Sequence, residues 1–191
     1  MLISKAQTDI KMKQDNLEKL KYPVGRLQVP KEITSIHIQQ GKDQIKTLPN
    51  KLRIATSGLS DSQLDQPYRE GGWSIRQITH HLADSHINSF TRFKLALTED
   101  RPTIKSYDQD AWVAGSDAKM PIDASLQILD GVHARLSHVL ENMSTEEYNR
   151  ELHHPEMQKN LNLAFITVMY GWHSDHHLHQ VKEMRARNGW N

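Results

Sequence analysis

Four long stretches of the sequence carry apolar residues at spacings of three and four, which is typical of helices that bury one face. They cover about residues 31–57, 74–97, 123–142 and 161–187. No segment alternates apolar and polar residues over the length that a half-buried strand needs. Four amphipathic helices with little strand pattern predict an all-α fold, a four-helix bundle.

Individual residues predict where these helices end. Pro49 falls inside the first pattern and predicts a break there, and Gly58 predicts its end. Ser74 precedes the second pattern and predicts its N-cap. The connection between the second and third helices is roughly 25 residues long, and connections of that length are usually functional or mobile. The stretch LHHPEMQKN (152–160) predicts a further loop.

A weak repeat links the two halves of the chain. LSDSQ (59–63) follows the first helix, and MSTEE (143–147) follows the third. Each is followed by a loop and then by a helix that carries tryptophan and histidine. Two helical hairpins related by a pseudo-twofold axis would produce this pattern, which chance similarity could also produce.

Composition excludes several classes of protein. With 191 residues, the chain is long enough for one domain, expected over residues 22–191, with a polar and peripheral extension over residues 1–21. Lys+Arg is 24 and Asp+Glu is 23, without the basic face that nucleic acid binding requires. No apolar run approaches the roughly 20 residues of a membrane span. The absence of cysteine and of an apolar leader favours a cytoplasmic protein.

The twelve histidines are the unusual feature of the composition, and four of them fall between positions 173 and 179. Residues four apart on a helix lie on the same face. The apolar stripe of the last helix passes through His173 and His177, whereas His176 and His179 lie further round. His173 and His177 are therefore expected to point into the bundle.

The second helix offers a third inward histidine. His81 lies beside Leu82 on the apolar side, while His80 is rotated by about 100° and is the alternative. A lone histidine on such a face is more often a hydrogen-bonded core residue. However, each buried polar group without a partner costs about 1–3 kcal/mol. A divalent ion held by two ligands at i and i+4 and one from another helix would remove that cost.

Three motifs in order carry a resemblance to a known family. They are YPVGRL (22–27), PYREGGWSIRQITHHLADSHINSFTRFKLALTE (67–99) and YGWHSDHHLHQ (170–180). With these motifs the chain resembles the YfiT/BstA group of the DinB-like superfamily over about residues 22–190. The resemblance implies a metal-binding four-helix bundle of the up-down-down-up type with long connections.

The resemblance also implies a site and an activity. The family's three metal-binding histidines correspond to His81, His173 and His177, the same three that helical spacing selects. Members of the group have been described as metal-dependent hydrolases or as transferases that join the thiol bacillithiol to electrophiles. The resemblance further implies a cytoplasmic protein that forms a homodimer.

Three imidazoles without a thiolate suit a single divalent ion, for which zinc is expected and nickel is the alternative. Three protein ligands leave a position open for a water molecule, which supports hydrolysis, or for a thiol, which supports nucleophilic attack. Zinc proteases carry their general base directly after the first histidine of the helix, where this chain has Ser174. That difference favours thiol transfer; a hydrolase and a non-catalytic metal-binding module are the alternatives.

Four further residues are candidates for the site. Asp84 is expected to orient a ligand histidine, and Tyr170 to donate a proton or a hydrogen bond. Arg76 and Arg92 are expected to bind the carboxylates of a thiol cosubstrate. Each has an ordinary alternative, as a surface charge or a packed core residue. The expected partners are a small-molecule substrate and a second copy of the chain, without nucleic acid or membrane.

Overall fold

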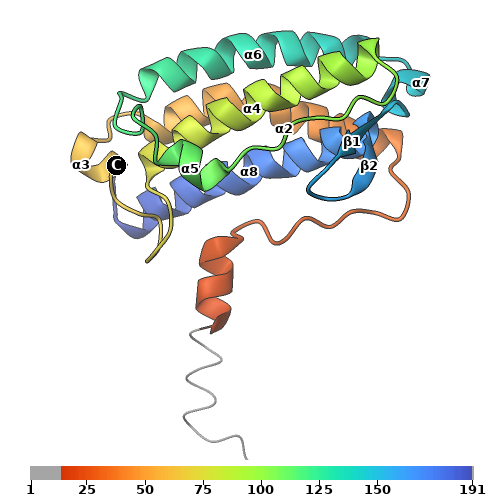
Figure 1. The fold of residues 1–191 in the computed structure, drawn as a ribbon. Coiled ribbons are helices and arrows are strands. Elements are labelled where there is room, and N and C mark those ends of the chain that lie inside the picture. The colour runs from red at the N-terminus through yellow and green to blue at the C-terminus, as the bar shows by residue number, and fades with distance from the viewer. Residues whose placement is uncertain (1–13, 191) are drawn as a thin grey trace, which may run out of the picture.

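The structure, a computed structural model, describes residues 14–190. Four long helices lie side by side in Figure 1, and they are α2 (Ser35–Thr56), α4 (Ile75–Thr98), α6 (Asp123–Asn142) and α8 (Leu163–Arg187). All four helices predicted from the sequence are present, with ends within a few residues of those expected. The predicted fold class, a bundle of four helices, is confirmed.

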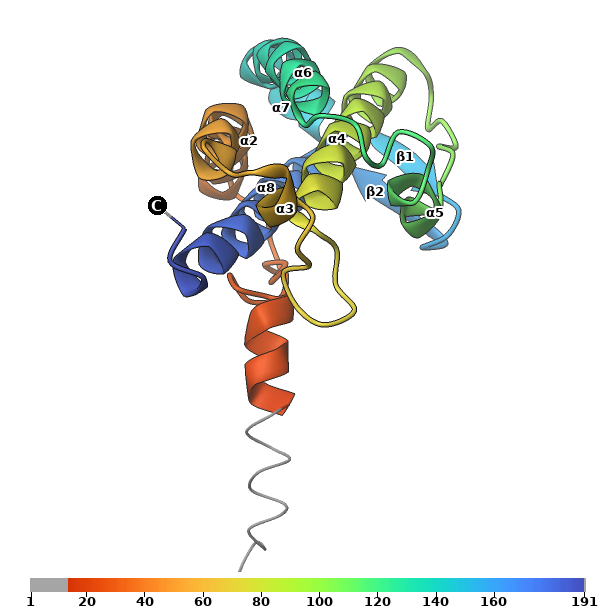
Figure 2. The same cartoon turned by 90° about the vertical axis from the view of Figure 1, so that its left-hand side faces the viewer.

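Contacts between side chains give the direction of each helix. α2 runs antiparallel to α6 and parallel to α8, whereas α4 runs parallel to α6 and antiparallel to α8. The contacts that fix these directions are Lys46 with Glu141, Arg53 with Asp130, Gln44 with Asp175, Ala55 with Arg185, His80 with Ser125, Phe90 with Arg135, Ser85 with Tyr170 and His81 with His177. The order is therefore up-down-down-up, and Figure 2 shows the four helices nearly end-on.

The two halves of the chain share more than the direction of their helices. The short helices α3 (Asp61–Leu64) and α7 (Thr145–Tyr148) follow α2 and α6. Each begins with the same capping box, in which the side chain of Ser60 or Ser144 accepts a hydrogen bond from the backbone three residues on. This repeat, together with the two parallel and two antiparallel helix pairs, is what the pseudo-twofold arrangement requires.

One part of the chain predicted as a loop is a β-hairpin. Strands β1 (Glu151–His154) and β2 (Lys159–Asn162) pair antiparallel, with Leu152 opposite Leu161. Both leucines are buried, so each strand contributes a single core residue. Four-residue strands are too short to show an alternating pattern, which is why the prediction of a loop over residues 152–160 was wrong. The long connection before α6 holds one short helix, α5 (Gln109–Val113).

Pro49 does not break the first helix, contrary to the sequence prediction. α2 continues through it, although proline cannot donate a hydrogen bond to the carbonyl four residues earlier. That carbonyl belongs to Ile45, and its oxygen accepts a hydrogen bond from Nδ1 of His133 at 2.6 Å instead. A side chain from α6 thus satisfies the acceptor that the proline leaves free, and the helix persists.

The apolar core forms two clusters along the bundle. One contains Leu48, Ile78, Leu129 and Val181, and the other contains Ile45, Phe93, Leu136 and Ile166, among other residues. Between the two, every helix except α2 contributes buried polar side chains. They are Ser85, His86 and Ser89 from α4, His133 from α6, and Ser174 and His177 from α8. The bundle therefore contains a layer of buried imidazoles and hydroxyls.

Two glycines allow α8 to approach α2 closely. A Cβ atom added to Gly171 would lie 2.6 Å from Cα of Gly41 and 2.5 Å from Oε1 of Gln44. A Cβ atom on Gly41 would lie 2.7 Å from the carbonyl oxygen of Thr167. Only hydrogen fits at both positions, and this contact sets the height and rotation of the helix that carries His173 and His177.

The segment before the bundle is helical over residues 14–21 and projects from it in both Figure 1 and Figure 2. It joins the bundle at Lys21, whose carbonyl oxygen accepts a hydrogen bond from Gln180 on α8. The division into an extension over residues 1–21 and a domain over residues 22–191 stays a prediction, and residues 1–13 lie outside the described part. Among the described helices, none has the length and apolar character needed to cross a membrane.

Replacing Gly171 by alanine should destabilise the protein, because the new methyl group would force α2 and α8 apart. We expect a loss of about 1–3 kcal/mol in the free energy of unfolding, typical of overpacked sites. Gly131→Ala is the matched control, since its Cβ atom meets nothing within 4 Å on α6. There alanine should stabilise the helix by up to about 1 kcal/mol. Urea denaturation measures both, and equal effects of the two substitutions would refute the close-contact interpretation.

Candidate metal centre

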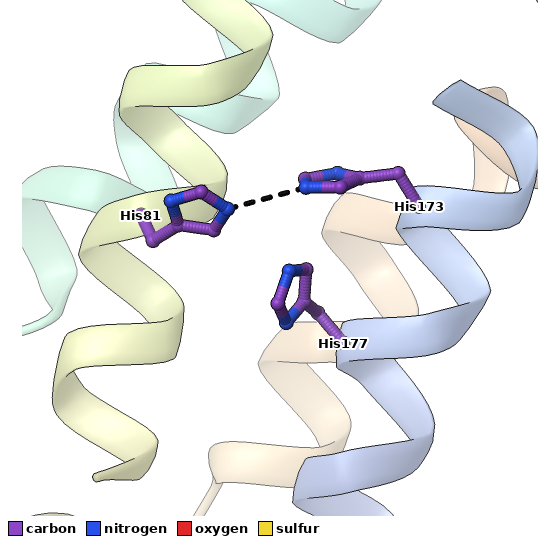
Figure 3. Close-up of side chains that lie close together, drawn as sticks. All are labelled: His81, His173 and His177. Carbon is purple, nitrogen blue, oxygen red and sulfur yellow. Dashed lines mark hydrogen bonds between the residues drawn. The ribbon is translucent and has the colours of Figure 1, made fainter. Parts of the chain in front are cut away.

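The three histidines selected from the sequence converge between α4 and α8. Nε2 of His81 lies 3.2 Å from Nε2 of His173, and Figure 3 shows the two rings facing each other. His177, one turn after His173, points into the same space. One nitrogen from each of the three rings lies within 4.8 Å of the others.

This geometry fits a divalent ion. Four-coordinate zinc with Zn–N bonds near 2.0–2.1 Å holds its nitrogen ligands about 3.3 Å apart, close to the distance between His81 and His173. Burial lowers the pKa of His81 to about 4 and holds the pKa values of His173 and His177 well below the ordinary value for histidine. The rings are therefore neutral at pH 7 and carry the lone pairs that a metal ligand needs.

A glutamine fixes the orientation of His177. Nδ1 of His177 donates a hydrogen bond to Oε1 of Gln180 at 2.8 Å, which leaves the Nε2 lone pair free. The amide group of Gln180 is held in turn, because its nitrogen donates to the carbonyl oxygen of Lys21 and to Nε2 of His176. The sequence analysis missed Gln180, although its position three residues after His177 places both on one face of the helix.

Asp84 does not orient His81 as predicted. Nδ1 of His81 is buried and has no hydrogen-bond partner among residues 14–190. The carboxyl group of Asp84 is half-buried and interacts electrostatically with Asp117 in the loop before α6. Burial, with a smaller contribution from Asp117, raises its pKa to about 6. The spacing of three residues places Asp84 near His81 on the helix surface. It does not determine the direction in which the carboxylate points.

A cavity of about 540 Å³ opens onto His81 and His173. Arg92 and Tyr170, both expected near the site, line it too. Arg92 donates a hydrogen bond to the hydroxyl of Tyr170 at 3.3 Å, and that hydroxyl donates to the carbonyl oxygen of Ser85. Within the described residues Arg92 forms no ion pair, so most of its donors are available to a ligand.

A second cavity, of about 400 Å³, reaches His177 from another side. Its wall includes three aromatic side chains, Tyr22, Tyr68 and Trp73. The indole of Trp73 lies against the centre, with its ring centroid 4.6 Å from that of His81. Gln109, at the start of α5, lines both cavities, so they approach each other at this residue.

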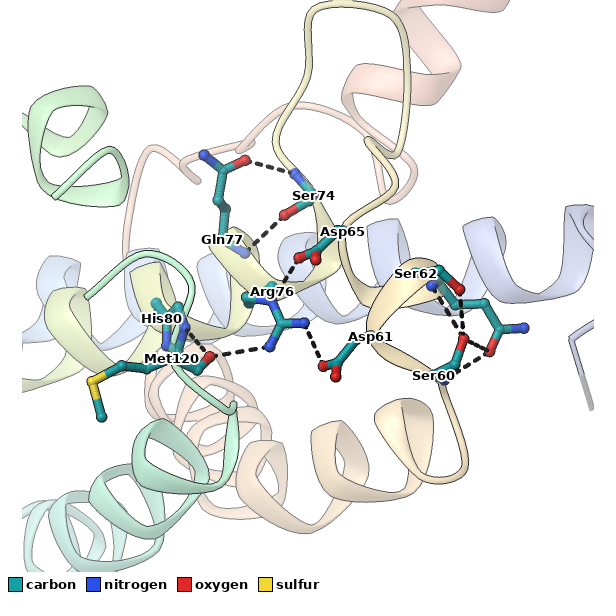
Figure 4. Close-up of polar contacts among 10 residues, drawn as sticks. Ser60, Asp61, Ser62, Asp65, Ser74, Arg76, Gln77, His80 and Met120 are labelled. Atoms are coloured by element: carbon teal, nitrogen blue, oxygen red, sulfur yellow. Dashed lines mark hydrogen bonds and ion pairs between the residues drawn. The ribbon is translucent and has the colours of Figure 1, made fainter. Parts of the chain in front are cut away.

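Arg76 has a structural role and does not line either cavity. Arg76 is 4% exposed, and its guanidinium group pairs with the carboxylates of Asp61 and Asp65 at 2.7 and 2.6 Å. It also donates to the carbonyl oxygen of Met120, as Figure 4 shows. The predicted cofactor contact of Arg76 is therefore not supported, because its donors tie α4 to α3 and to the loop before α6.

His80, the alternative to His81, belongs to the same structural region. Its ring hydrogen-bonds to the hydroxyl of Ser125 at 2.7 Å and to the carbonyl oxygen of Met120 at 3.2 Å (Figure 4). Both partners lie on the side of α4 that faces α6. The choice of His81 over His80, made from the position of the apolar stripe, therefore agrees with the packing of α4.

Helix α8 brings no carboxylate to the centre. Its acidic residue nearest the ligands, Asp175, faces α2, where its Oδ2 atom accepts a hydrogen bond from Gln44 at 2.6 Å. The hydroxyl of Ser174 donates to the carbonyl oxygen of Tyr170 within the helix. The expectation that the general base of zinc proteases has no counterpart on this helix therefore matches the structure.

An up-down-down-up bundle with three converging histidines defines a metal-binding four-helix protein. The DinB superfamily profile matches residues 44–181. This chain belongs to the DinB superfamily, and the resemblance to the YfiT group is confirmed by the relatives that follow.

Two relatives and one solved structure cover nearly the whole chain. A protein of Geobacillus kaustophilus (strain HTA426), named a "putative metal-dependent hydrolase", is 41% identical over 175 residues, 91% of this chain and 98% of that protein. A protein of the same description from Bacillus cereus (strain B4264) is 42% identical over 171 residues, 90% of this chain and 98% of that protein. YfiT from Bacillus subtilis, described as "a probable metal-dependent hydrolase with an unusual four-helix bundle topology", matches with a TM-score of 0.86 and 38% identity, over 91% of this chain and 99% of that one.

Removing one ligand should remove the metal. We expect His177→Ala to lose stoichiometric binding of zinc, because only two of the three converging nitrogens remain. His179→Ala is the control on the same helix, since the ring of His179 hydrogen-bonds to the carbonyl oxygen of Asp175 and lies outside the centre. Elemental analysis of the untagged proteins after zinc loading and buffer exchange measures both. Zinc retained in full by His177→Ala would contradict the assignment.

Acid should destabilise the metal-free protein. In the folded chain, burial lowers the pKa values of His81 and His133 to about 4. In the unfolded chain both rings are exposed to solvent and have the ordinary pKa of histidine. Between the folded-chain value and the ordinary pKa of about 6.5, the unfolded chain binds protons that the folded chain does not, so stability falls as the pH falls. Urea denaturation from about pH 7 to about pH 4.5 should show this. The slope should be smaller in His133→Phe; an unchanged slope would argue against a neutral buried ring.

Proposed function

We propose that this chain is a metal-dependent enzyme that transfers a low-molecular-weight thiol to an electrophilic carbon. His81, His173 and His177 would hold a divalent ion, which when bound lowers the pKa of a thiol or a water molecule that reaches it. In the transfer, a sulfur–carbon bond forms as the bond to the leaving group breaks with its electron pair. The thiol proton passes to solvent.

The observation that carries this proposal is the presence of two cavities at one centre. One reaches His81 and His173, and the other reaches His177. Transfer brings two organic molecules to the same point, whereas hydrolysis brings one together with water. Two cavities that share Gln109 in their walls provide separate space for a thiol and an electrophile.

Arg92 supports a thiol that carries a carboxylate. Its guanidinium group lines the first cavity with two of the ligand histidines, and it can bind a carboxylate through two parallel hydrogen bonds. Tyr170 helps to hold Arg92 through its hydroxyl at 3.3 Å. We assign Arg92 to substrate binding and Tyr170 to orienting Arg92.

Hydrolysis is the second candidate, and a specific observation favours it. The relatives are named "putative metal-dependent hydrolase" and YfiT "a probable metal-dependent hydrolase", and two carboxylates, Asp108 and Glu156, line the first cavity. Either could accept a proton from water. A non-catalytic metal-binding module is the third candidate; it would bind metal without turning over any electrophile or ester.

Several finer features belong to the same proposal. Three neutral imidazoles without a thiolate suit zinc, with nickel as the alternative. The absence of cysteine from the whole sequence suits a reducing cytoplasm. A homodimer, expected from the family resemblance, also remains part of the proposal and is tested by light scattering of the purified protein.

Conjugation of a fluorogenic electrophile distinguishes the candidates. The zinc-loaded or nickel-loaded protein is incubated with monochlorobimane and one of several thiols. A transferase makes the fluorescent conjugate faster than the metal-free protein does, whereas a hydrolase cleaves an ester substrate without conjugating. Conjugation at the uncatalysed rate with every thiol, together with ester cleavage, would replace the first candidate by the second.

Arg92→Met should raise the KM for a thiol that carries a carboxylate, by about tenfold or more, because a charge-assisted hydrogen bond is lost. Cysteamine lacks a carboxylate, so its KM should not change. The control is Lys94→Met, two residues further along α4 at an exposed position. Initial rates at fixed electrophile concentration measure these values. Equal effects on both thiols would exclude a carboxylate contact.

A further inference from the structure

Two more buried histidines lie behind the metal ligands, and the proposed reaction does not use them. His86 on α4 is 0% exposed, and His133 on α6 is 2% exposed. Their rings stack, with centroids 4.7 Å apart and planes at 22°. Buried polar groups in folded proteins nearly always have hydrogen-bond partners, yet within the described residues only two of the four ring nitrogens of this pair have one.

The tautomer of His133 is fixed by the proline of another helix. Pro49 has no N–H, so the carbonyl oxygen of Ile45 lacks its helical donor. Nδ1 of His133 lies 2.6 Å from that oxygen. Because a carbonyl oxygen only accepts, Nδ1 carries the proton of this ring. Nε2 of His133 therefore carries a lone pair.

The tautomer of His173 is set by His86. Nε2 of His173 is the atom that faces His81, so it must carry the lone pair that binds a metal. The proton is then on Nδ1, which lies 3.4 Å from Nε2 of His86 and donates to it. Since Nε2 of His86 accepts this hydrogen bond, the ring proton of His86 is on Nδ1.

The two nitrogens that remain, Nδ1 of His86 and Nε2 of His133, are both buried, and neither has a hydrogen-bond partner among residues 14–190. Their rings are stacked nearly parallel, so the contact between them is packing and not a hydrogen bond. The ring of Tyr170 meets His86 edge-on from another direction, with centroids 5.2 Å apart and planes at 84°. His86 is therefore enclosed by aromatic rings and cannot readily turn over.

We propose that His86 is a positioning residue, which accepts a hydrogen bond from Nδ1 of His173 and so holds this metal ligand in the tautomer with a free Nε2 lone pair. His133, hydrogen-bonded to the carbonyl oxygen of Ile45, packs against the ring of His86 and keeps it in place. This inference depends on the three-histidine centre of the proposed function, but not on the reaction that the centre performs.

The tautomers can be read without any metal. Long-range ¹⁵N–¹H spectra of the metal-free protein, labelled with ¹⁵N-histidine, distinguish a protonated Nδ1 from a protonated Nε2. We expect protonated Nδ1 and unprotonated Nε2 for both His173 and His133. A protonated Nε2 on His173, or a mixture of forms, would overturn the proposal. Since no metal is added, this result is independent of whether the protein is a transferase.

Metal affinity tests His86 directly. His86→Phe keeps an aromatic ring in the stack but removes the acceptor, and should weaken zinc binding by about 10- to 100-fold. His86→Gln restores an acceptor and should recover part of the loss. His138→Phe is the control, an exposed histidine of α6. Competition with a chromophoric chelator measures the zinc Kd, and circular dichroism checks folding. Unchanged affinity in a folded His86→Phe would overturn the proposal.

Discussion

The structure depends on keeping imidazoles neutral inside a helical bundle. Burial in a layer between two apolar clusters lowers the pKa of each ring, because a charged imidazole cannot be solvated there. Neutral rings offer lone pairs, and lone pairs that converge within 4.8 Å make a metal centre. The close contact of Gly41 and Gly171 and the hydrogen bond from His177 to Gln180 both serve this arrangement, by placing α8 and turning its rings.

Local patterns were sufficient to predict the four helices, but not every feature within them. Apolar spacing and the cap at Ser74 are properties of neighbouring residues, so they can be read from the chain. Pro49 was misread because proline inside a helix usually costs about 3 kcal/mol, and the contact that compensates for it comes from His133, far away in sequence. The hairpin at Leu152 and Leu161 was missed because its strands are too short to show a period.

The convergence of the three histidines was predictable because two of them lie four residues apart and the apolar stripe separates His81 from its neighbour His80. The surrounding residues were not. Arg76 and Arg92 lie on the same helix and look alike in sequence. One is neutralised by Asp61 and Asp65 from the preceding segment, and the other faces a cavity. Only the folded chain shows which carboxylates each arginine meets.

The lead-in to the bundle forms part of the second cavity through Lys21 and Tyr22, which precede the region that matches the family profile. Two contacts attach residues 21–25 to α8. The ring of Tyr22 packs against that of His176, and the indole of Trp172 donates a hydrogen bond to the carbonyl oxygen of Gly25. The residues before the profile match thus shape part of one cavity wall without supplying any of the three converging histidines. Exchanging them would alter the shape of the second cavity while leaving those histidines in place.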